Sequence, residues 1–297
     1  MHLSLTAISP DVGLIPQPLF YIVIGVVGAM IGSFLNVVIH RLPREESIVL
    51  PGSKCSSCGT AIAFYDNVPI LSYILLGGRC RKCKTHFSAR YPAVEALTAL
   101  LFIATAWHDD FTVALPFDLV FVAAITALIF IDAEHMILPN AITYPGMVFA
   151  LGARLAIPLL TGTPHFDDLS MLLNGVLAGM PLWAASIIGA LIGALIGGGS
   201  LWLMGWTWEK LRGIEAMGLG DVKMMFMVGA YLGWRLTILN IFLGVLSGSL
   251  IGIVLMARQG ERNMQMLLPF GVFLGIGAIA ALLIGPQIVG WYAGQFR

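Results

Sequence analysis

Two aspartates stand at the ends of apolar segments, where an ionisable side chain is costly and by default marks a functional site. Asp132 ends an apolar run, and Asp221 closes the sequence Met-Gly-Leu-Gly-Asp at 217–221. Two carboxylates held close together cannot both ionise readily, so they share one proton. The ionised carboxylate can take a proton from water while its protonated partner polarises a carbonyl group. The pair therefore predicts aspartic-protease chemistry with Asp132 and Asp221 as the catalytic residues.

Three neighbours of Asp221 are predicted to bind the substrate. Gly218 and Gly220 allow unusual backbone angles and the close approach of an extended peptide. Lys223 is expected either to contact an acidic substrate residue or to lower the pKa of Asp221. The alternative is structural: Asp221 caps a helix, Asp132 is solvated, and Lys223 extends its amine to the interface.

The four cysteines form two Cys-x-x-Cys pairs, Cys55 with Cys58 and Cys80 with Cys83, separated by 21 residues. This spacing is typical of a tetrahedral Zn²⁺ site with four thiolate ligands. Two disulfides or four inert cysteines are the alternatives, and a reducing cytoplasm counts against the disulfides. Four thiolates leave no open position for water, so the metal is predicted to be structural rather than catalytic.

The composition is that of a membrane protein. Of the 297 residues, 58% are hydrophobic and 11% are charged, against about 25% charged in a typical soluble domain. The mean hydropathy is +0.90. Residues 12–39, 169–208, 236–257 and 263–296 carry no Asp, Glu, Lys or Arg, and each stretch reaches the roughly 20 residues that a membrane-spanning helix needs. The formal net charge of zero gives no reason to expect a nucleic-acid partner.

The distribution of basic residues predicts the topology. Eight of the sixteen Lys and Arg residues lie within 41–90, which places that segment in the cytoplasm. No Lys or Arg precedes Arg41, so the N-terminal apolar stretch is expected to stay as the first helix rather than act as a cleaved signal. Further crossings are predicted at 93–107, 117–131, 141–160, 171–208, 222–233, 236–257 and 268–291.

These segments predict an all-α polytopic membrane protein of about eight transmembrane helices with both termini outside. A small cytoplasmic zinc-binding domain with four cysteines lies between helices 1 and 2. The predicted domains are the first helix at 1–40, the cysteine domain at 41–92 and a transmembrane aspartic peptidase domain at 93–297. In this topology both aspartates reach the cytoplasmic membrane boundary.

Two further polar residues flank the cysteine domain. Asn36, on the first helix, is expected to make a polar contact with another helix. Glu95, near the start of helix 93–107, is expected to be a first-turn residue favoured by the helix dipole.

Five motifs in order carry a resemblance that runs nearly end to end. They are GSFLNVVIHRLP at 32–43, the four cysteines, RYPAVE at 90–95, DAEHMILP at 132–139 and GLGDVK at 218–223. The chain resembles the type IV prepilin peptidases, which are bifunctional leader peptidases and N-methyltransferases with a GxGD-type aspartic protease site.

The resemblance implies a bacterial inner-membrane enzyme with its active site facing the cytoplasm. It implies cleavage of type IV prepilins and pseudopilins after a Gly, followed by methylation of the new N-terminal residue, usually Phe, with S-adenosylmethionine. The sequence contains no dinucleotide-type glycine fingerprint after a strand, so methylation is expected from the resemblance alone. The cysteine domain and its flanking motifs are where the methyl-donor site is expected.

An ion-coupled transporter is the alternative function, with Asp132 and Asp221 relaying protons or binding cations. The position of both carboxylates at a membrane face, rather than near the midplane, counts against it.

Overall fold

The structure is a computed structural model that describes residues 16–166, 179–213, 217–259 and 268–295. Within these residues the regular elements are helices, accompanied by two isolated β-bridges in the cysteine-bearing segment. The described residues cluster into two compact units, one up to residue 127 and the other from residue 128 onward. The three domains predicted from the sequence, with boundaries after residues 40 and 92, were separated by their expected functions. This division stays a prediction.

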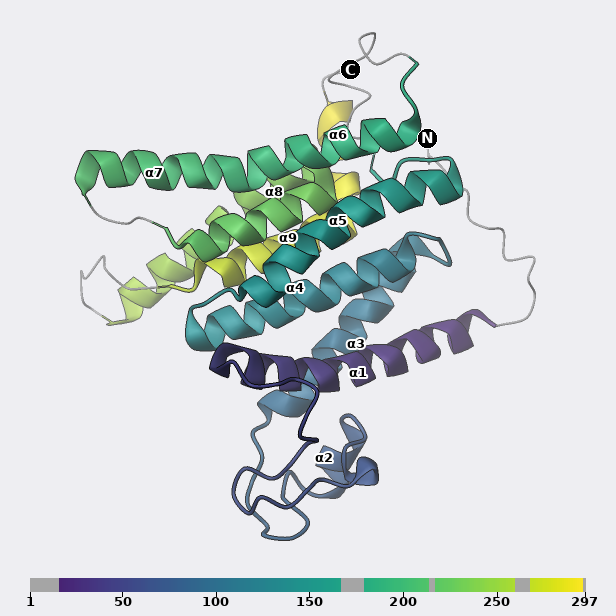
Figure 1. The fold of residues 1–297 in the computed structure, drawn as a ribbon, viewed down its shortest axis with the longest axis vertical. Coiled ribbons are helices and arrows are strands. Elements are labelled where there is room, and N and C mark those ends of the chain that lie inside the picture. Colours follow the sequence, from purple (N-terminus) through teal and green to yellow (C-terminus); the bar gives the residue numbers. More distant parts are fainter. Residues whose placement is uncertain (1–15, 167–178, 214–216, 260–267, 296–297) are drawn as a thin grey trace. The chain divides into compact units, whose positions relative to one another are not determined.

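The first unit contains two helices, α1 (Gln17–Arg41) and α3 (Arg90–Asp109), that pack against each other (Figure 1). The segment between them carries two 3₁₀ turns, η1 (Leu42–Arg44) and η2 (Phe64–Asp66), and the short helix α2 (Leu71–Leu75). The last turn of α1 holds His40 and Arg41, where basic side chains complement the helix dipole.

Two glycines on α1 set how closely this helix approaches α3. A Cβ added to Gly28 would lie 2.8 Å from the Ala99 Cα, and one added to Gly32 would lie 2.7 Å from the Glu95 Cα. This small-xxx-small spacing is typical of closely packed membrane helices. The approach brings Asn36 to the start of α3, where its Nδ2 donates a hydrogen bond to the Tyr91 carbonyl oxygen at 3.0 Å. The expected contact of Asn36 with another helix is confirmed.

The expectation for Glu95 is wrong. Helix α3 begins at Arg90 rather than at 93, because a first helical turn tolerates Pro92, whose missing N–H has no acceptor there anyway. Glu95 therefore lies beyond the first turn. Its side chain is buried, and Oε2 accepts the Ile70 N–H at 2.7 Å.

The second unit contains five helices, α5 (Asn140–Thr161), α6 (Leu182–Ala194), α7 (Ser200–Arg212), α8 (Leu219–Gln259) and α9 (Phe270–Gly294). It also takes the last eight residues of α4 (Leu115–His135), whose earlier residues belong to the first unit. Helix α8 contacts α5, α6 and α9 (Figure 1). Much of the first half of α8 is accordingly buried, and its fully enclosed side chains include Met224, Met225, Val228, Tyr231 and Leu232.

Glycines again set the packing of α6 against α8. A Cβ on Gly193 would collide with the backbone at Gly229, and a Cβ on Gly229 would collide with the backbone at Gly193. A π-helical turn (Leu195–Gly199) joins α6 and α7 into one continuous run (Figure 1). This run agrees with the single crossing predicted for 171–208, of which residues 171–178 lie outside the described residues.

Six described helices are long and apolar enough to cross a membrane: Gln17–Arg44, Leu115–His135, Asn140–Thr161, Leu182–Arg212, Leu219–Leu255 and Phe270–Gly294. The helical multi-pass class is confirmed. The expected number of eight stays a prediction, because it counts α3 as a further crossing and divides α8 in two. Helix α8 does break at Gly233, whose φ of 77° and ψ of 174° are not helical.

Candidate active sites

Asp132 lies near the C-terminal end of α4 and is 5% exposed. Its Oδ2 accepts the backbone N–H of Val272 at 3.0 Å. Val272 is the third residue of α9, so the carboxylate meets one of the first-turn N–H groups that have no acceptor within their own helix. A helix N-terminus is a favourable place for an acidic side chain.

Asp221 is the third residue of α8, and it approaches Asp132 at Gly271 of α9. A Cβ added to Gly271 would lie 2.8 Å from Asp132 Oδ2 and 3.1 Å from Asp221 Oδ1. The distance between Asp132 Oδ2 and Asp221 Oδ1 is therefore no greater than the sum of these two distances. Two hydrogen bonds of about 2.8 Å to one water span a similar length. The geometry thus brings both aspartates within reach of a single bridging water.

Gly271 was not among the residues predicted from the sequence. Any side chain there would fill the space between the two carboxylates, so the glycine keeps that space open. The available signal was a glycine at the start of a charge-free segment, directly after Pro269 and Phe270. This signal is too common in membrane helices to single out the residue.

The three residues predicted to bind substrate have different surroundings. A Cβ on Gly220 would lie 3.1 Å from the Leu138 Cβ, so this glycine lets the start of α8 pack against the segment after α4. A Cβ on Gly218 would meet no heavy atom closer than 3.9 Å. Lys223 Nζ donates to Asn140 Oδ1 at 2.9 Å and lies 5.4 Å from the Tyr144 ring centroid. Substrate binding by these residues stays a prediction.

The four cysteines come together in the first unit. Their Sγ atoms all lie within 4.8 Å of one another, and the Cys55 and Cys83 sulfurs are 3.7 Å apart. In a tetrahedron of thiolates with Zn–S bonds of 2.3 Å, the sulfurs are about 3.8 Å apart. The cluster therefore fits one zinc ion with all four positions taken by sulfur.

The two cysteine pairs repeat one local structure. The Gly59 N–H donates to the Cys55 carbonyl oxygen at 2.9 Å, and the Lys84 N–H donates to that of Cys80 at 3.0 Å. Gly59 and Lys84 both have positive φ, 66° and 61°. The repeated knuckle presents both cysteines of each pair to one point, as a shared metal requires.

A threonine follows each knuckle and contacts its second sulfur. Cys58 Sγ lies 3.3 Å from Thr60 Oγ1, and Cys83 Sγ lies 3.3 Å from Thr85 Oγ1. The Thr85 hydroxyl, followed by the Thr85 backbone, lowers the pKa of the Cys83 thiol to about 6. The Thr60 hydroxyl likewise lowers the pKa of Cys58. Both threonines favour the thiolate form, which is the form that binds metals. This pair of threonines was not predicted from the sequence, although the shared spacing Cys-x-x-Cys-x-Thr could have indicated it.

Two family models match the chain in sequence. The Bacterial Peptidase A24 N-terminal domain matches residues 26–109, and the Type IV leader peptidase family matches residues 119–253. The first match contains the cysteine cluster, and the second contains both aspartates.

Curated relatives match over most of their length, and they share the name "Prepilin leader peptidase/N-methyltransferase". A Pseudomonas aeruginosa protein is 35% identical over 289 residues, covering 89% of this chain and 90% of the relative. An Aeromonas hydrophila protein is 35% identical over 308 residues, with 94% and 95% covered. A Myxococcus xanthus protein is 39% identical over 246 residues, with 83% and 66% covered. The search of solved structures found no match of comparable significance.

The fold and these sites define a helical multi-pass membrane protein with paired carboxylates and a four-cysteine cluster. The matches identify the family: the chain belongs to the type IV leader peptidase family, so the resemblance seen in the sequence is confirmed. Nothing in these matches supports the ion-coupled transporter.

Proposed function

We propose that the chain removes the leader peptides of type IV prepilins and pseudopilins and then methylates the new N-terminal residue. The observation that carries the cleavage step is the approach of Asp132 and Asp221 to one point beside Gly271. The methylation step rests on the name that the relatives share. In this function Asp132 and Asp221 are the catalytic residues, and Gly218, Gly220 and Lys223 border the bound peptide.

The carboxylate pair hydrolyses the peptide bond without a covalent intermediate. Asp132, whose Oδ2 already accepts the Val272 N–H, takes a proton from the bridging water. Asp221 carries the shared proton and donates it to the carbonyl oxygen of the scissile bond. The water oxygen bonds to the carbonyl carbon, and the C–N bond breaks as the leaving amine takes up a proton from the pair. The products are a leader ending in a carboxylate, after Gly, and a pilin with a free N-terminal amine.

Two further components belong to this proposal. One structural Zn²⁺ binds Cys55, Cys58, Cys80 and Cys83, and stabilises a segment with little hydrophobic core of its own. When bound, S-adenosylmethionine supplies an electrophilic methyl group: the amine forms one N–C bond and loses a proton as the S–C bond breaks and leaves a neutral thioether.

In this proposal the enzyme lies in the bacterial inner membrane with both aspartates at the cytoplasmic face. The basic residues of segment 41–90 support this orientation. Eight crossings result when α3 and the two parts of α8 on either side of Gly233 are counted with the other described spans.

The test is cleavage of a synthetic prepilin segment by the purified protein in detergent or lipid, with product masses as the readout. Asp132→Asn and Asp221→Asn should each lower the cleavage rate by about 10²- to 10⁴-fold, because each removes one partner of the acid–base pair. Asp110→Asn, at an exposed position outside the pair, is the matched control and should cleave normally. Wild-type product should gain one methyl mass only when S-adenosylmethionine is present. Cleavage retained in Asp132→Asn or in Asp221→Asn would contradict the assignment of these two residues as the catalytic pair.

A further inference from the structure

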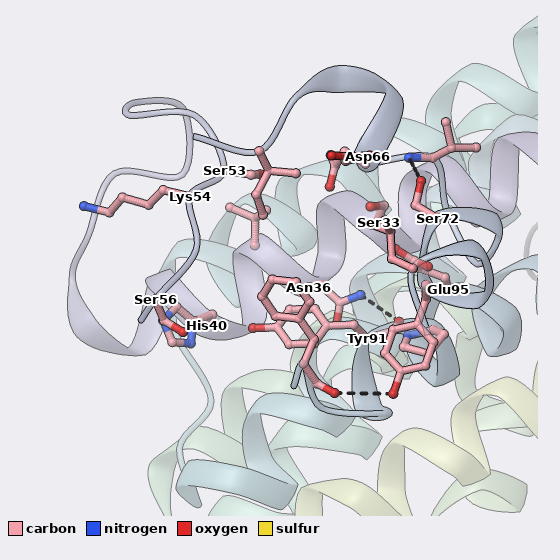
Figure 2. A pocket seen from close by; sticks show the side chains of 18 of the residues that line it. Ser33, Asn36, His40, Ser53, Lys54, Ser56, Asp66, Ser72, Tyr91 and Glu95 are labelled. Atoms are coloured by element: carbon pink, nitrogen blue, oxygen red, sulfur yellow. Dashed lines mark hydrogen bonds between the residues drawn. The ribbon is translucent and has the colours of Figure 1, made fainter. Parts of the chain in front are cut away.

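The first unit contains a partly open cavity of about 620 Å³ that takes no part in the proposed cleavage step. Its walls come from the C-terminal half of α1, the start of α3 and the loops that carry the cysteine knuckles (Figure 2). Pockets for small organic ligands have volumes of roughly 300–1,000 Å³. The cavity is therefore large enough for a nucleoside-sized molecule.

Asn36 in the cavity wall has an unused hydrogen-bond acceptor. The side chain is 3% exposed, and its Nδ2 donates to the Tyr91 carbonyl oxygen at 3.0 Å. Its Oδ1 is buried and has no hydrogen-bond partner within the described part of the chain. Buried polar atoms are nearly always paired. A bound molecule with an N–H or O–H group would supply the missing donor.

Glu95 adds a carboxylate to the same wall (Figure 2). It is 8% exposed, and no ion pair involving it occurs among the described residues. Its hydrogen-bond donor is the Ile70 N–H, at 2.7 Å. A buried carboxylate needs donors or positive charge around it. The cavity is thus prepared for a ligand that carries hydroxyl groups or a cationic group.

Ile70 holds a strained backbone conformation at this point. Its φ of 62° and ψ of −52° are unusual for any residue with a side chain, and especially for a β-branched one. Such strain concentrates at binding and catalytic sites, where the surroundings keep it in place. Here the conformation aims the Ile70 N–H at Glu95 and fixes the carboxylate in the cavity wall.

Further residues of the lining suit an aromatic ring and an anionic group. Tyr73, Phe87 and Tyr91 line the cavity, and the Tyr73 hydroxyl donates to the Phe87 carbonyl oxygen at 3.3 Å. Aromatic surfaces of this kind stack on planar rings. Arg79 also lines the cavity and offers a partner to a carboxylate.

We propose that this cavity is the binding site for S-adenosylmethionine, with Glu95 and Asn36 as its anchoring residues. The inference rests on the proposed methyltransferase function and names its site. The molecule combines a planar base, a ribose diol, a cationic sulfonium and an amino-acid end. Acidic residues bind ribose hydroxyls in other nucleotide sites, so Glu95 accepts from the diol or faces the cationic end. Asn36 Oδ1 accepts from an N–H or O–H group of the ligand.

The experiment measures binding directly, by equilibrium dialysis of the full-length protein with radiolabelled S-adenosylmethionine. Glu95→Gln keeps an acceptor for the Ile70 N–H but removes the charge, and it should raise the Kd about tenfold or more. Asn36→Leu is a second variant that removes the unpaired acceptor and should weaken binding in the same direction. Glu45→Gln is the matched control, because Glu45 is exposed and does not line the cavity. Melting temperature and zinc content establish that each variant is folded.

Two failures can be told apart. Wild-type protein that cleaves the prepilin segment but neither binds S-adenosylmethionine nor adds a methyl mass would overturn the proposed methylation itself. Wild-type protein that methylates, while folded Glu95→Gln and Asn36→Leu bind the donor as tightly as wild type, would overturn the cavity assignment alone. Tighter binding of a basic leader peptide than of S-adenosylmethionine, lost in Glu95→Gln, would also overturn it and assign the cavity to the substrate.

Discussion

Asp132 and Asp221 approach each other beside a glycine, and the absent side chain at Gly271 leaves the room between them. The arrangement combines three helices, because Asp132 lies near the end of α4, Asp221 near the start of α8 and Gly271 near the start of α9. The Val272 N–H holds Asp132 in place. At the scale of single residues, the site thus depends on one position that carries no functional group at all.

Gly271→Ala is expected to lower cleavage by about 10²-fold. The new methyl group would lie 2.8 Å from Asp132 Oδ2 and 3.1 Å from Asp221 Oδ1, so it would displace the carboxylates or the water, and a misplacement of about 1 Å costs about this much. The measurement is the initial rate of prepilin cleavage. Gly290→Ala is the control on the same helix, because a Cβ there meets nothing within 4 Å. Equal rates for the two variants would contradict the role of Gly271.

The segment between α1 and α3 has only short regular elements, the turns η1 and η2 and the five-residue helix α2. Its most ordered feature is the pair of knuckles whose sulfurs all lie within 4.8 Å of one another. So small a segment buries little apolar surface, and a structural metal commonly supplies the missing stability. At the scale of elements, the knuckles stabilise the loops that form part of the cavity wall.

Removal of the metal is expected to unfold this segment. Wild-type protein should contain one zinc ion per chain, and Cys83→Ser should lose most of it because one of four ligands is gone. Metal analysis measures the content, and limited proteolysis should then cut faster within 41–92. Ser57→Ala lies inside the first knuckle without supplying a ligand, so it should retain the metal. A full zinc content in Cys83→Ser would rule out the four-thiolate site.

The described chain carries its two candidate sites in different compact units. Asp132, Asp221 and Gly271 all belong to the unit from residue 128 onward, whereas every residue lining the cavity belongs to the unit up to residue 127. The two family models divide the chain in a similar place, at 26–109 and 119–253. At the scale of the whole molecule, cleavage and methylation are therefore expected to be separable.

Asp221→Asn should methylate a peptide that already has the mature N-terminus, at close to the wild-type rate, although it cannot process the precursor. The reason is that no residue of the carboxylate site lines the cavity. Mass spectrometry of both peptides, with saturating S-adenosylmethionine, makes the comparison. Loss of methylation on the mature peptide in a folded variant would show that one site serves both steps.

The class of the protein, and the charged and sulfur-bearing residues of its sites, could be predicted from the amino-acid sequence alone. Long uncharged stretches indicate membrane-spanning helices. An aspartate at the end of such a stretch indicates a functional site. Two Cys-x-x-Cys pairs predict a metal site. The break at Gly233 also lies where the sequence placed a boundary between helices. These features are local, because composition and spacing within one segment are enough to define them.

Which of these groups contact one another depends on the tertiary structure. The space at Gly271, the hydrogen bond from Ile70 to Glu95 and the unpaired Oδ1 of Asn36 depend on helix packing between residues far apart in the chain. Glu95 was misplaced because a shift of the helix start from 93 to Arg90 moves it out of the first turn. Local patterns specify helices, but side-chain volume and the close approach permitted by glycines select the partners of each helix face.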